Sequence, residues 1–293
     1  FSVICAPEGY TYVPDDNFEQ ALIDLGYDDV LDDFVVTDSI SGVTDLVLNS
    51  KEISDLTGIE DFTALTHLNC ESNQLTSLDV SANTALTVLS CDYNELTTLD
   101  VSNNTALTGL YVQFNSLTAL DVSSNTALTE LHCEVNQLTV LDVSANTALT
   151  RLGCHSNQLD SLDVSSNTAL TYLMCSNNLF TSLDVSNNTA LTTLVCDMLQ
   201  LTTLDVSNNT SLADLQCGEN LLTSLDVSSN PALTSLEGHN NQLTYLNMKN
   251  GVTEQLGYLK VTGNSSLTCI ETLDPDYATA NWTYENGNID EGV

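Results

Sequence analysis

Apolar residues recur at a fixed spacing along most of the chain, and one pattern returns every 21 residues from position 65 to position 246. The copy at 65–85 reads LTHLNCESNQLTSLDVSANTA. In its first part the apolar residues Leu68 and Cys70 alternate with the polar residues His67 and Asn69. Alternation with a period of two indicates a short strand with one buried face. The sequence therefore predicts one such strand in every repeat.

The second half of the repeat alternates as well, with Leu78 and Val80 facing inward and Asp79 facing outward. A unit of 21 residues leaves no room for a helix after this segment. One repeat cannot bury its own apolar side, whereas stacked repeats bury a continuous core. We therefore expect a solenoid with a parallel sheet on its concave side. Its convex side should be extended chain or a second short strand.

Two asparagine positions recur once per repeat, where the chain turns. Buried turn backbone needs hydrogen-bond partners, and a side-chain amide supplies them. The two rows are Asn73, Asn94, Asn115, Asn136, Asn157, Asn178, Asn220 and Asn241, and Asn83, Asn104, Asn125, Asn146, Asn167, Asn188, Asn209 and Asn230. Leu199 replaces the asparagine that the first row would place at this position. We expect this break to leave turn backbone unpaired, at a cost of about 1–3 kcal/mol.

Seven of the nine cysteines share one position of the repeat, and Val112 fills that position in the repeat that lacks one. The seven are Cys70, Cys91, Cys133, Cys154, Cys175, Cys196 and Cys217. A position that accepts Cys or Val is a small buried apolar site, where a free thiol packs as a hydrophobe. Parallel side chains are poorly placed for disulfides, and a row of single thiols does not converge on a metal ion. We expect reduced core cysteines, and we expect Cys5 and Cys269 to lie too far apart to pair.

The segment at 65–75 fits L-x-x-L-x-C-x-x-N-x-L, which is the leucine-rich-repeat pattern with cysteine in its third apolar position. Over nearly all of its length the chain resembles bacterial secreted leucine-rich-repeat proteins. Residues 14–35 have helical spacing, with Asp15 or Asp16 as N-cap and Gly26 as stop, and resemble the helical cap of internalin-like proteins. Residues 267–293 are similar to the C-terminal cap of those proteins, in which the resemblance implies a disulfide from Cys269 to a later cysteine. The sequence holds no later cysteine, so we expect it to be cut from a longer protein.

The ends of a solenoid differ from its middle because they cover the ends of the core. We accordingly expect an N-terminal cap at 1–42, a solenoid of about ten turns at 43–267 and a C-terminal cap at 268–293. The predicted fold class is a leucine-rich-repeat solenoid, mainly β, with a small helical N-terminal cap.

The charge of the chain narrows the range of partners. Four Lys and Arg residues stand against forty Asp and Glu residues, which gives a formal net charge of −36. A polyanion repels nucleic acids and anionic membrane surfaces, so neither is an expected partner. No apolar run approaches the roughly 20 residues that span a bilayer, so we expect no membrane insertion. High acidity also favours solubility and cationic partners.

Motifs of the common enzyme classes are absent from the sequence. It contains no G-x-S-x-G, H-E-x-x-H, P-loop or G-x-G-x-x-G segment. Carboxylate pairs occur all over so acidic a surface and therefore do not indicate glycoside hydrolysis. The four histidines are dispersed; only His132 and His155 are expected to meet, and two ligands do not make a metal site. We expect a protein without catalytic activity.

Positions that vary between repeats are better candidates for binding than positions that repeat. Five positions in each turn face the concave side and vary, and aromatic residues gather there in adjacent turns. The predicted ligand-binding patch comprises Tyr93, Tyr111, Phe114, Glu130, His132, Val135, Arg151, His155, Tyr172 and Met174. Exposed aromatic patches on a rigid sheet are typical of interaction surfaces. The alternative is scattered apolar exposure with one ion pair, in which Glu130 is the expected neighbour of Arg151.

A row of aspartates also repeats, and it has two readings. Its members are Asp79, Asp100, Asp121, Asp142, Asp163, Asp184, Asp205 and Asp226. As a metal site, the row would bind calcium, although a single file offers each ion only one or two carboxylates. As a structural feature, each aspartate accepts a hydrogen bond from its own turn. The second reading is favoured, so no cofactor is expected, with calcium as the alternative.

The resemblance implies a non-catalytic recognition module of an exported bacterial protein, at the cell surface or outside the cell, that takes a protein or a glycan on the concave sheet. Other domains of the same polypeptide are then expected partners. A structural spacer or adhesin stalk, stabilised by calcium through the aspartate row, is the alternative.

Overall fold

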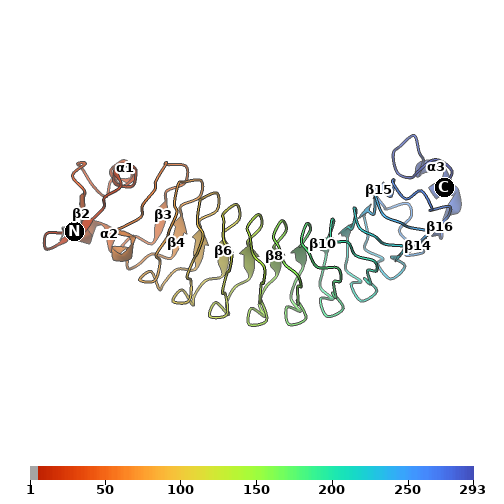
Figure 1. Cartoon of the computed structure of the whole chain (residues 1–293), viewed down its shortest axis with the longest axis horizontal. Coiled ribbons are helices and arrows are strands. Elements are labelled where there is room, and N and C mark those ends of the chain that lie inside the picture. The colour runs from red at the N-terminus through yellow and green to blue at the C-terminus, as the bar shows by residue number, and fades with distance from the viewer. Residues whose placement is uncertain (1–5) are drawn as a thin grey trace. The chain divides into compact units, whose positions relative to one another are not determined.

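The computed structural model describes residues 6–293 (Figure 1). It comprises two compact units, which join in the sequence between Leu138 and Thr139. Cys5 lies outside the described residues. Within residues 6–293, no helix combines the length and the apolar character that crossing a bilayer requires.

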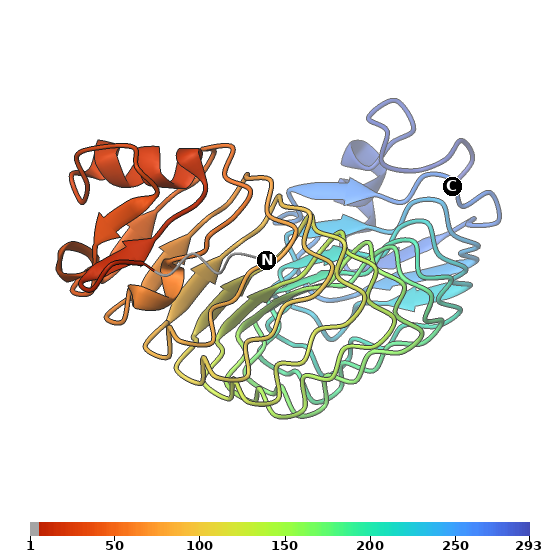
Figure 2. The same cartoon turned by 60° about the vertical axis from the view of Figure 1, so that its left-hand side comes forward.

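The first unit begins with short strands and helices and continues with one strand per turn of the repeat. Its elements are β1 (Tyr10–Tyr12), α1 (Asp16–Leu25), β2 (Phe34–Val36), α2 (Thr37–Ile40), β3 (Asp45–Val47), η1 (Ile59–Asp61), β4 (His67–Asn69), β5 (Val88–Ser90), β6 (Gly109–Tyr111) and β7 (Glu130–His132). Strands β1 and β2 pair antiparallel, whereas β3 to β7 form a parallel sheet in sequence order. Figure 2 shows strands of this sheet side by side. Their central leucines are paired in register.

The second unit contains two parallel sheets and a C-terminal helix. The elements are β8 (Arg151–Gly153), β9 (Tyr172–Met174), β10 (Thr193–Val195), β11 (Asp214–Gln216), β12 (Ser224–Asp226), β13 (Ser235–Glu237), β14 (Tyr245–Met248), β15 (Tyr258–Lys260), β16 (Ile270–Thr272) and α3 (Pro275–Asn281). Strands β8, β9, β10, β11, β13 and β15 pair in this order. The second sheet has the order β12, β14, β16 and belongs to the other side of the repeat.

Both units are parallel β-solenoids, which confirms the predicted fold class. A second short strand occurs only in the last turns of the described chain, at β12, β14 and β16. The corresponding segments of the earlier described turns are extended chain and turns, which is the other form expected for this side. The division into caps at 1–42 and 268–293 around the repeats remains a prediction.

Helix α1, in the predicted N-terminal cap, starts and stops at residues that its sequence indicates. Asp15 is the N-cap, and its Oδ1 accepts hydrogen bonds from the N–H groups of Asn17 and Phe18, each at 3.0 Å. Its Oδ2 accepts a bond of 2.8 Å from the N–H of Ser54, which ties the helix to the following turn. Gly26 ends the helix at a φ of 82°, in the left-handed region where glycine is unstrained.

None of the seven stacked cysteines forms a disulfide, and all of them are buried, as predicted. Cys70, Cys91 and Cys133 lie in the first unit and the other four in the second. Burial raises the pKa of the Cys70 thiol to about 12 and also raises the pKa of Cys91. These thiols are therefore neutral and unreactive core residues. Cys269 is a free, exposed cysteine.

Both asparagine rows hydrogen-bond to the turns, as predicted. In the first row the Asn94 amide donates to the carbonyls of Cys70 and Cys91, at 3.0 and 3.1 Å, and its Oδ1 accepts from the N–H of Leu75 at 2.9 Å. In the second row the Asn104 amide donates to the carbonyls of Val80 and Asn83, at 2.9 and 3.0 Å. Each side chain thus links its own turn to the preceding one.

The break at Leu199 leaves one backbone group without a partner. In the other turns, the Oδ1 of the asparagine accepts a hydrogen bond from a backbone N–H of the preceding turn. This N–H belongs to the residue two positions after the preceding position of the row; the Asn94 Oδ1, for example, accepts from Leu75. At the break, the corresponding N–H is that of Phe180, and the Leu199 side chain has no oxygen to accept its hydrogen bond. No other described residue accepts it. The Oδ1 of Asn220 instead accepts from both Leu199 and Leu201, at 3.1 and 3.0 Å. The prediction of unpaired backbone is confirmed for this single group.

The residue before each position of the first row, including the break at Leu199, has a left-handed backbone, which the alternation pattern did not reveal. Its φ lies between 52° and 56° at Ser72, Tyr93, Phe114, Val135, Ser156, Asn177, Met198, Glu219 and Asn240. This conformation costs L-residues roughly 1–2 kcal/mol, and asparagine tolerates it best after glycine. A β-branched side chain such as Val135 is strained there.

We expect Val135→Asn to raise the free energy of unfolding by about 1 kcal/mol, because asparagine relieves this backbone strain. The chain itself uses asparagine at the same position, at Asn177 and Asn240, with φ of 53° and 52°. Urea denaturation followed by circular dichroism measures the change. An equal or lower stability would show that Val135 is not strained.

Candidate functional site

The predicted patch divides between the two units, and its members lie on or beside the solvent-facing side of the parallel strands, here called the sheet face. Tyr93, Tyr111, Phe114, Glu130, His132 and Val135 belong to the first unit. Arg151, His155, Tyr172 and Met174 belong to the second. In each unit the structure brings several of these side chains into direct contact.

An exposed aromatic stack stands at the turns after β5 and β6. The rings of Tyr93 and Phe114 are parallel within 10° and their centroids are 4.3 Å apart. They remain 48% and 40% exposed. Such stacking contributes about 0.5–1.5 kcal/mol, so the two rings form a firm apolar surface that is still open to a partner.

A second stack lies on the strands β6 and β7 themselves. The Tyr111 ring lies 5.4 Å from that of His132, with 12° between their planes. The Tyr111 hydroxyl donates a hydrogen bond of 2.7 Å to Glu130 Oε2. Gly109 makes room for this arrangement, since a Cβ there would lie 3.1 Å from the Tyr111 ring. The aromatic and acidic residues are therefore held in fixed positions.

In the second unit the patch is built around Tyr172. The Arg151 guanidinium lies over the Tyr172 ring, 4.5 Å from its centroid, which is a cation–π contact. The Tyr172 hydroxyl donates to the sulfur of Met174 at 3.8 Å. His155 Nδ1 lies 3.0 Å from the hydroxyl of Ser156. The expected contacts of Arg151 with Glu130 and of His155 with His132 join residues of the two units and stay predictions.

Carboxylates at the edge of the sheet face are the functional candidates that were not singled out from the sequence. They occupy the position directly after the core cysteine, at Glu71, Asp92 and Glu134. Glu134 accepts a bond of 2.9 Å from His132, and its second oxygen is buried without a hydrogen-bond partner. Gln113 Oε1, in the same column, is also buried and unpaired. The recurrence of acidic residues at one variable position was the signal available in the sequence.

Among these carboxylates at the edge of the sheet face, Asp92 has a pKa that the fold raises well above its ordinary value. Burial raises its pKa to about 6, and the charges of Glu71 and Glu134 contribute to the increase. The carboxylate form therefore opposes folding. A raised pKa means that this group contributes stability below pH 4 that is lost as the pH rises through 6.

We expect Asp92→Asn to raise the free energy of unfolding at pH 7 by about 1–2 kcal/mol and to remove part of the stability loss between pH 4 and 6. The full change in pKa corresponds to about 3 kcal/mol, and screening by water at the sheet edge reduces it. Denaturation at a series of pH values measures this slope. The prediction is contradicted if the free energy of unfolding of the wild type rises between pH 4 and pH 7 as steeply as that of Asp92→Asn.

The second unit has a related cluster around His239. Burial raises the pKa of Asp197, while the Gly218 N–H, at 2.6 Å, and His239 lower it. His239 lies 3.9 Å from Glu219 and 3.8 Å from Glu237. Gly218 leaves room for the imidazole, because a Cβ there would lie 2.5 Å from it. Both units thus combine histidine and carboxylates beside the strands.

The repeated aspartates form hydrogen bonds to their own turns. Asp79 Oδ1 accepts from the Ser81 N–H at 2.9 Å, and the same bond of 2.9 Å recurs in every later member of the row. The hydroxyl and the N–H of Ser81 lower the pKa of Asp79. Among the described residues, no three members of the row bring their carboxylates together. The structure thus shows the structural role, and calcium binding by the row stays a prediction.

Similarity to solved structures extends over most of the chain. It superposes over 92% of its length on the functional domain of InlJ from Listeria monocytogenes, described as including a cysteine ladder, with a TM-score of 0.75 and 36% identity. An internalin, InlF, of the same species matches 92% of the chain with a TM-score of 0.72. A leucine-rich-repeat protein of Leptospira interrogans matches 86% of it with a TM-score of 0.64. Each of these two structures is 22% identical to the chain, and the matches cover 93% of the InlF structure and 73% of the Leptospira structure. At this identity they show the fold alone.

Sequence comparison gives a shorter match. The chain is 44% identical to Internalin J of Listeria monocytogenes over 72 residues, which is 25% of this chain and 8% of that protein. It spans 65% of the InlJ structure. No known protein-family model matches the sequence. With its 21-residue repeats and its stacked cysteines, the chain is a leucine-rich-repeat solenoid and a homologue of internalin J.

Proposed function

We propose that the chain is a non-catalytic recognition module of an exported bacterial surface protein and that it binds a protein ligand on the sheet face. The carrying observation is the Tyr93–Phe114 stack, which is rigid and yet 48% and 40% exposed. Large aromatic side chains held in place dominate the energetics of protein interfaces. The similarity to internalin J, which covers only part of that protein, supports a role at the bacterial surface.

The acceptors beside the stack favour a protein ligand that carries Lys or Arg. Asp92, Gln113 and Glu134 lie in one column along the first unit, and Gln113 Oε1 and Glu134 Oε2 are buried without partners. A buried acceptor gains most from a donor that reaches it. The net charge of −36 would also speed the approach of a basic partner. Binding should therefore weaken as salt increases.

A screen of the wild-type chain against protein and glycan arrays tests the proposal. We expect a protein ligand whose affinity falls at least tenfold in the double variant Tyr93→Ala, Phe114→Ala, since truncating a central interface aromatic residue costs about 2 kcal/mol or more. Asp163→Asn, in the repeated aspartate row, is the control and should bind as the wild type does. Absence of any ligand would overturn the proposal in favour of a structural spacer. Binding of a glycan alone, or binding that survives the double change, would overturn a protein site on this face.

A further inference from the structure

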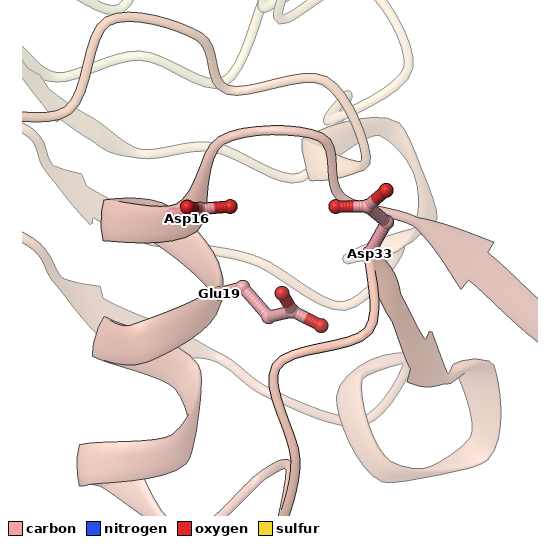
Figure 3. Close-up of side chains that lie close together, drawn as sticks. All are labelled: Asp16, Glu19 and Asp33. Carbon is pink, nitrogen blue, oxygen red and sulfur yellow. The ribbon is translucent and has the colours of Figure 1, made fainter.

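Three carboxylates of the N-terminal cap converge on one point (Figure 3). Asp16 lies in the first turn of α1, Glu19 one turn further on, and Asp33 directly before β2. One carboxylate oxygen of each lies within 4.8 Å of the others. This is the only group of three or more such ligands that residues 6–293 bring together.

Glu19 distinguishes this group from an exposed acidic cluster, because its carboxylate is buried and one of its oxygens has no hydrogen-bond partner. The side chain is only 1% exposed. Its Oε1 accepts hydrogen bonds from the N–H groups of Asp32 and Phe34, at 2.9 and 3.2 Å. Its Oε2 is buried without a hydrogen-bond partner and belongs to the carboxylate that faces Asp16 and Asp33 in Figure 3. A buried, unpaired carboxylate oxygen is costly unless a cation or a proton satisfies it.

Within residues 6–293, no basic side chain supplies that cation. The ion pairs of the described chain do not include Asp16, Glu19 or Asp33, and the nearest one in sequence joins Lys51 to Asp24. Three negative groups at this distance repel one another in the absence of a counterion. The arrangement is therefore suited to a ligand of positive charge.

We propose that Asp16, Glu19 and Asp33 bind one Ca²⁺ ion. The donors are all oxygens, which excludes the metals that prefer nitrogen or sulfur. Ligands about 2.4 Å from a common ion lie up to about 5 Å apart, in agreement with the observed spread. Calcium accepts six to eight oxygens in flexible geometry, so water at the exposed Asp16 side completes its shell. Magnesium demands a stricter octahedron and gives up its water reluctantly.

The bound ion would join the first turn of α1 to the loop before β2. Glu19 already holds this loop through the two N–H groups of Asp32 and Phe34. Calcium would thus stabilise the N-terminal cap independently of any ligand on the sheet face. The site is also distinct from the repeated aspartate row, which would take up several ions.

Calorimetric titration of the full chain with CaCl₂, after treatment with EDTA, tests the site. We expect one ion per chain, with a Kd of roughly 10⁻⁴–10⁻³ M as in extracellular calcium modules, and a higher melting temperature in calcium. Asp33→Asn and Asp16→Asn should each weaken binding at least tenfold. Asparagine accepts the left-handed φ of 68° at position 33, so this variant should remain folded.

Two controls distinguish the site from general acidity. Asp29→Asn makes the same charge change at an exposed position of the cap, and Asp163→Asn makes it in the aspartate row; both should bind calcium within about twofold of the wild type. Three results would overturn the proposal: no binding at 10 mM calcium, several weak ions per chain, or unchanged affinity in Asp33→Asn. Equal melting temperatures of Asp33→Asn and the wild type in EDTA confirm that lost binding is not lost folding.

Discussion

Replacing Asn115 by alanine is expected to lower the free energy of unfolding by about 3 kcal/mol, because the change leaves three buried backbone groups without partners. The Asn115 amide donates to the carbonyls of Cys91 and Val112, at 3.0 and 3.1 Å. Its Oδ1 accepts from the N–H of Leu96 at 2.9 Å. All three bonds are buried, so water cannot replace them without opening the turn.

Asn103→Ala provides the matched control for this prediction. Asn103 is exposed and makes a single bond of 3.4 Å to the Ser81 carbonyl, so its loss should cost less than about 0.5 kcal/mol. Urea denaturation followed by circular dichroism measures both variants. Equal stabilities of the two variants would refute the structural role of the asparagine row. The natural break at Leu199 fits this account, since only one N–H group lacks an acceptor there.

Phe18→Ala should cost about 3–5 kcal/mol in the N-terminal cap, which is the usual range for removing a buried aromatic ring from a core. Phe18 is fully buried on α1 and packs against Phe62, with ring centroids 6.3 Å apart. Repeats in a solenoid contact only their neighbours, so a loosened cap exposes the core of the turn at β3. We expect faster hydrogen exchange in α1 and β3, with little change in the last turns.

Leu25→Ala is the control for the cap. This residue ends the same helix and is 45% exposed, so its removal should leave hydrogen exchange in β3 unchanged. Hydrogen exchange measured by mass spectrometry resolves the effect by segment. Uniform loss of protection along the chain in Phe18→Ala would show that the molecule unfolds as one unit and would contradict the local effect.

Regular spacing made most of the fold predictable. Alternation around Leu68 and Cys70 placed the strands, and the recurring asparagines placed the turns, because stacked repeats must satisfy the same backbone groups each time. The start of α1 at Asp15 and its end at Gly26 followed from capping chemistry. The left-handed residues at Tyr93 and Phe114 did not follow, since neither side chain is typical of that conformation.

The candidate sites were predictable only in part. A periodic pattern of residues does not specify side-chain rotamers, nor which residues far apart in the sequence come together in the fold. The variable positions pointed to Tyr111 and Glu130, but not to the hydrogen bond between them. The acidic group of the cap was missed for a different reason. Asp33 lies 14 residues after Glu19 in an irregular loop, and only the fold brings it back to the helix.

The central claim is that repeated positions hold the solenoid and that variable positions bind. Titration of the ligand found in the screen against the triple variant Tyr93→Ser, Tyr111→Ser, Phe114→Ser tests it most directly. Serine occupies the equivalent positions of the chain at Ser72 and Ser90, so we expect a stability loss of only about 1–2 kcal/mol, from the lost stacking. Affinity should fall by roughly a hundredfold or more. An affinity within about twofold of the wild type in this folded variant would contradict the claim.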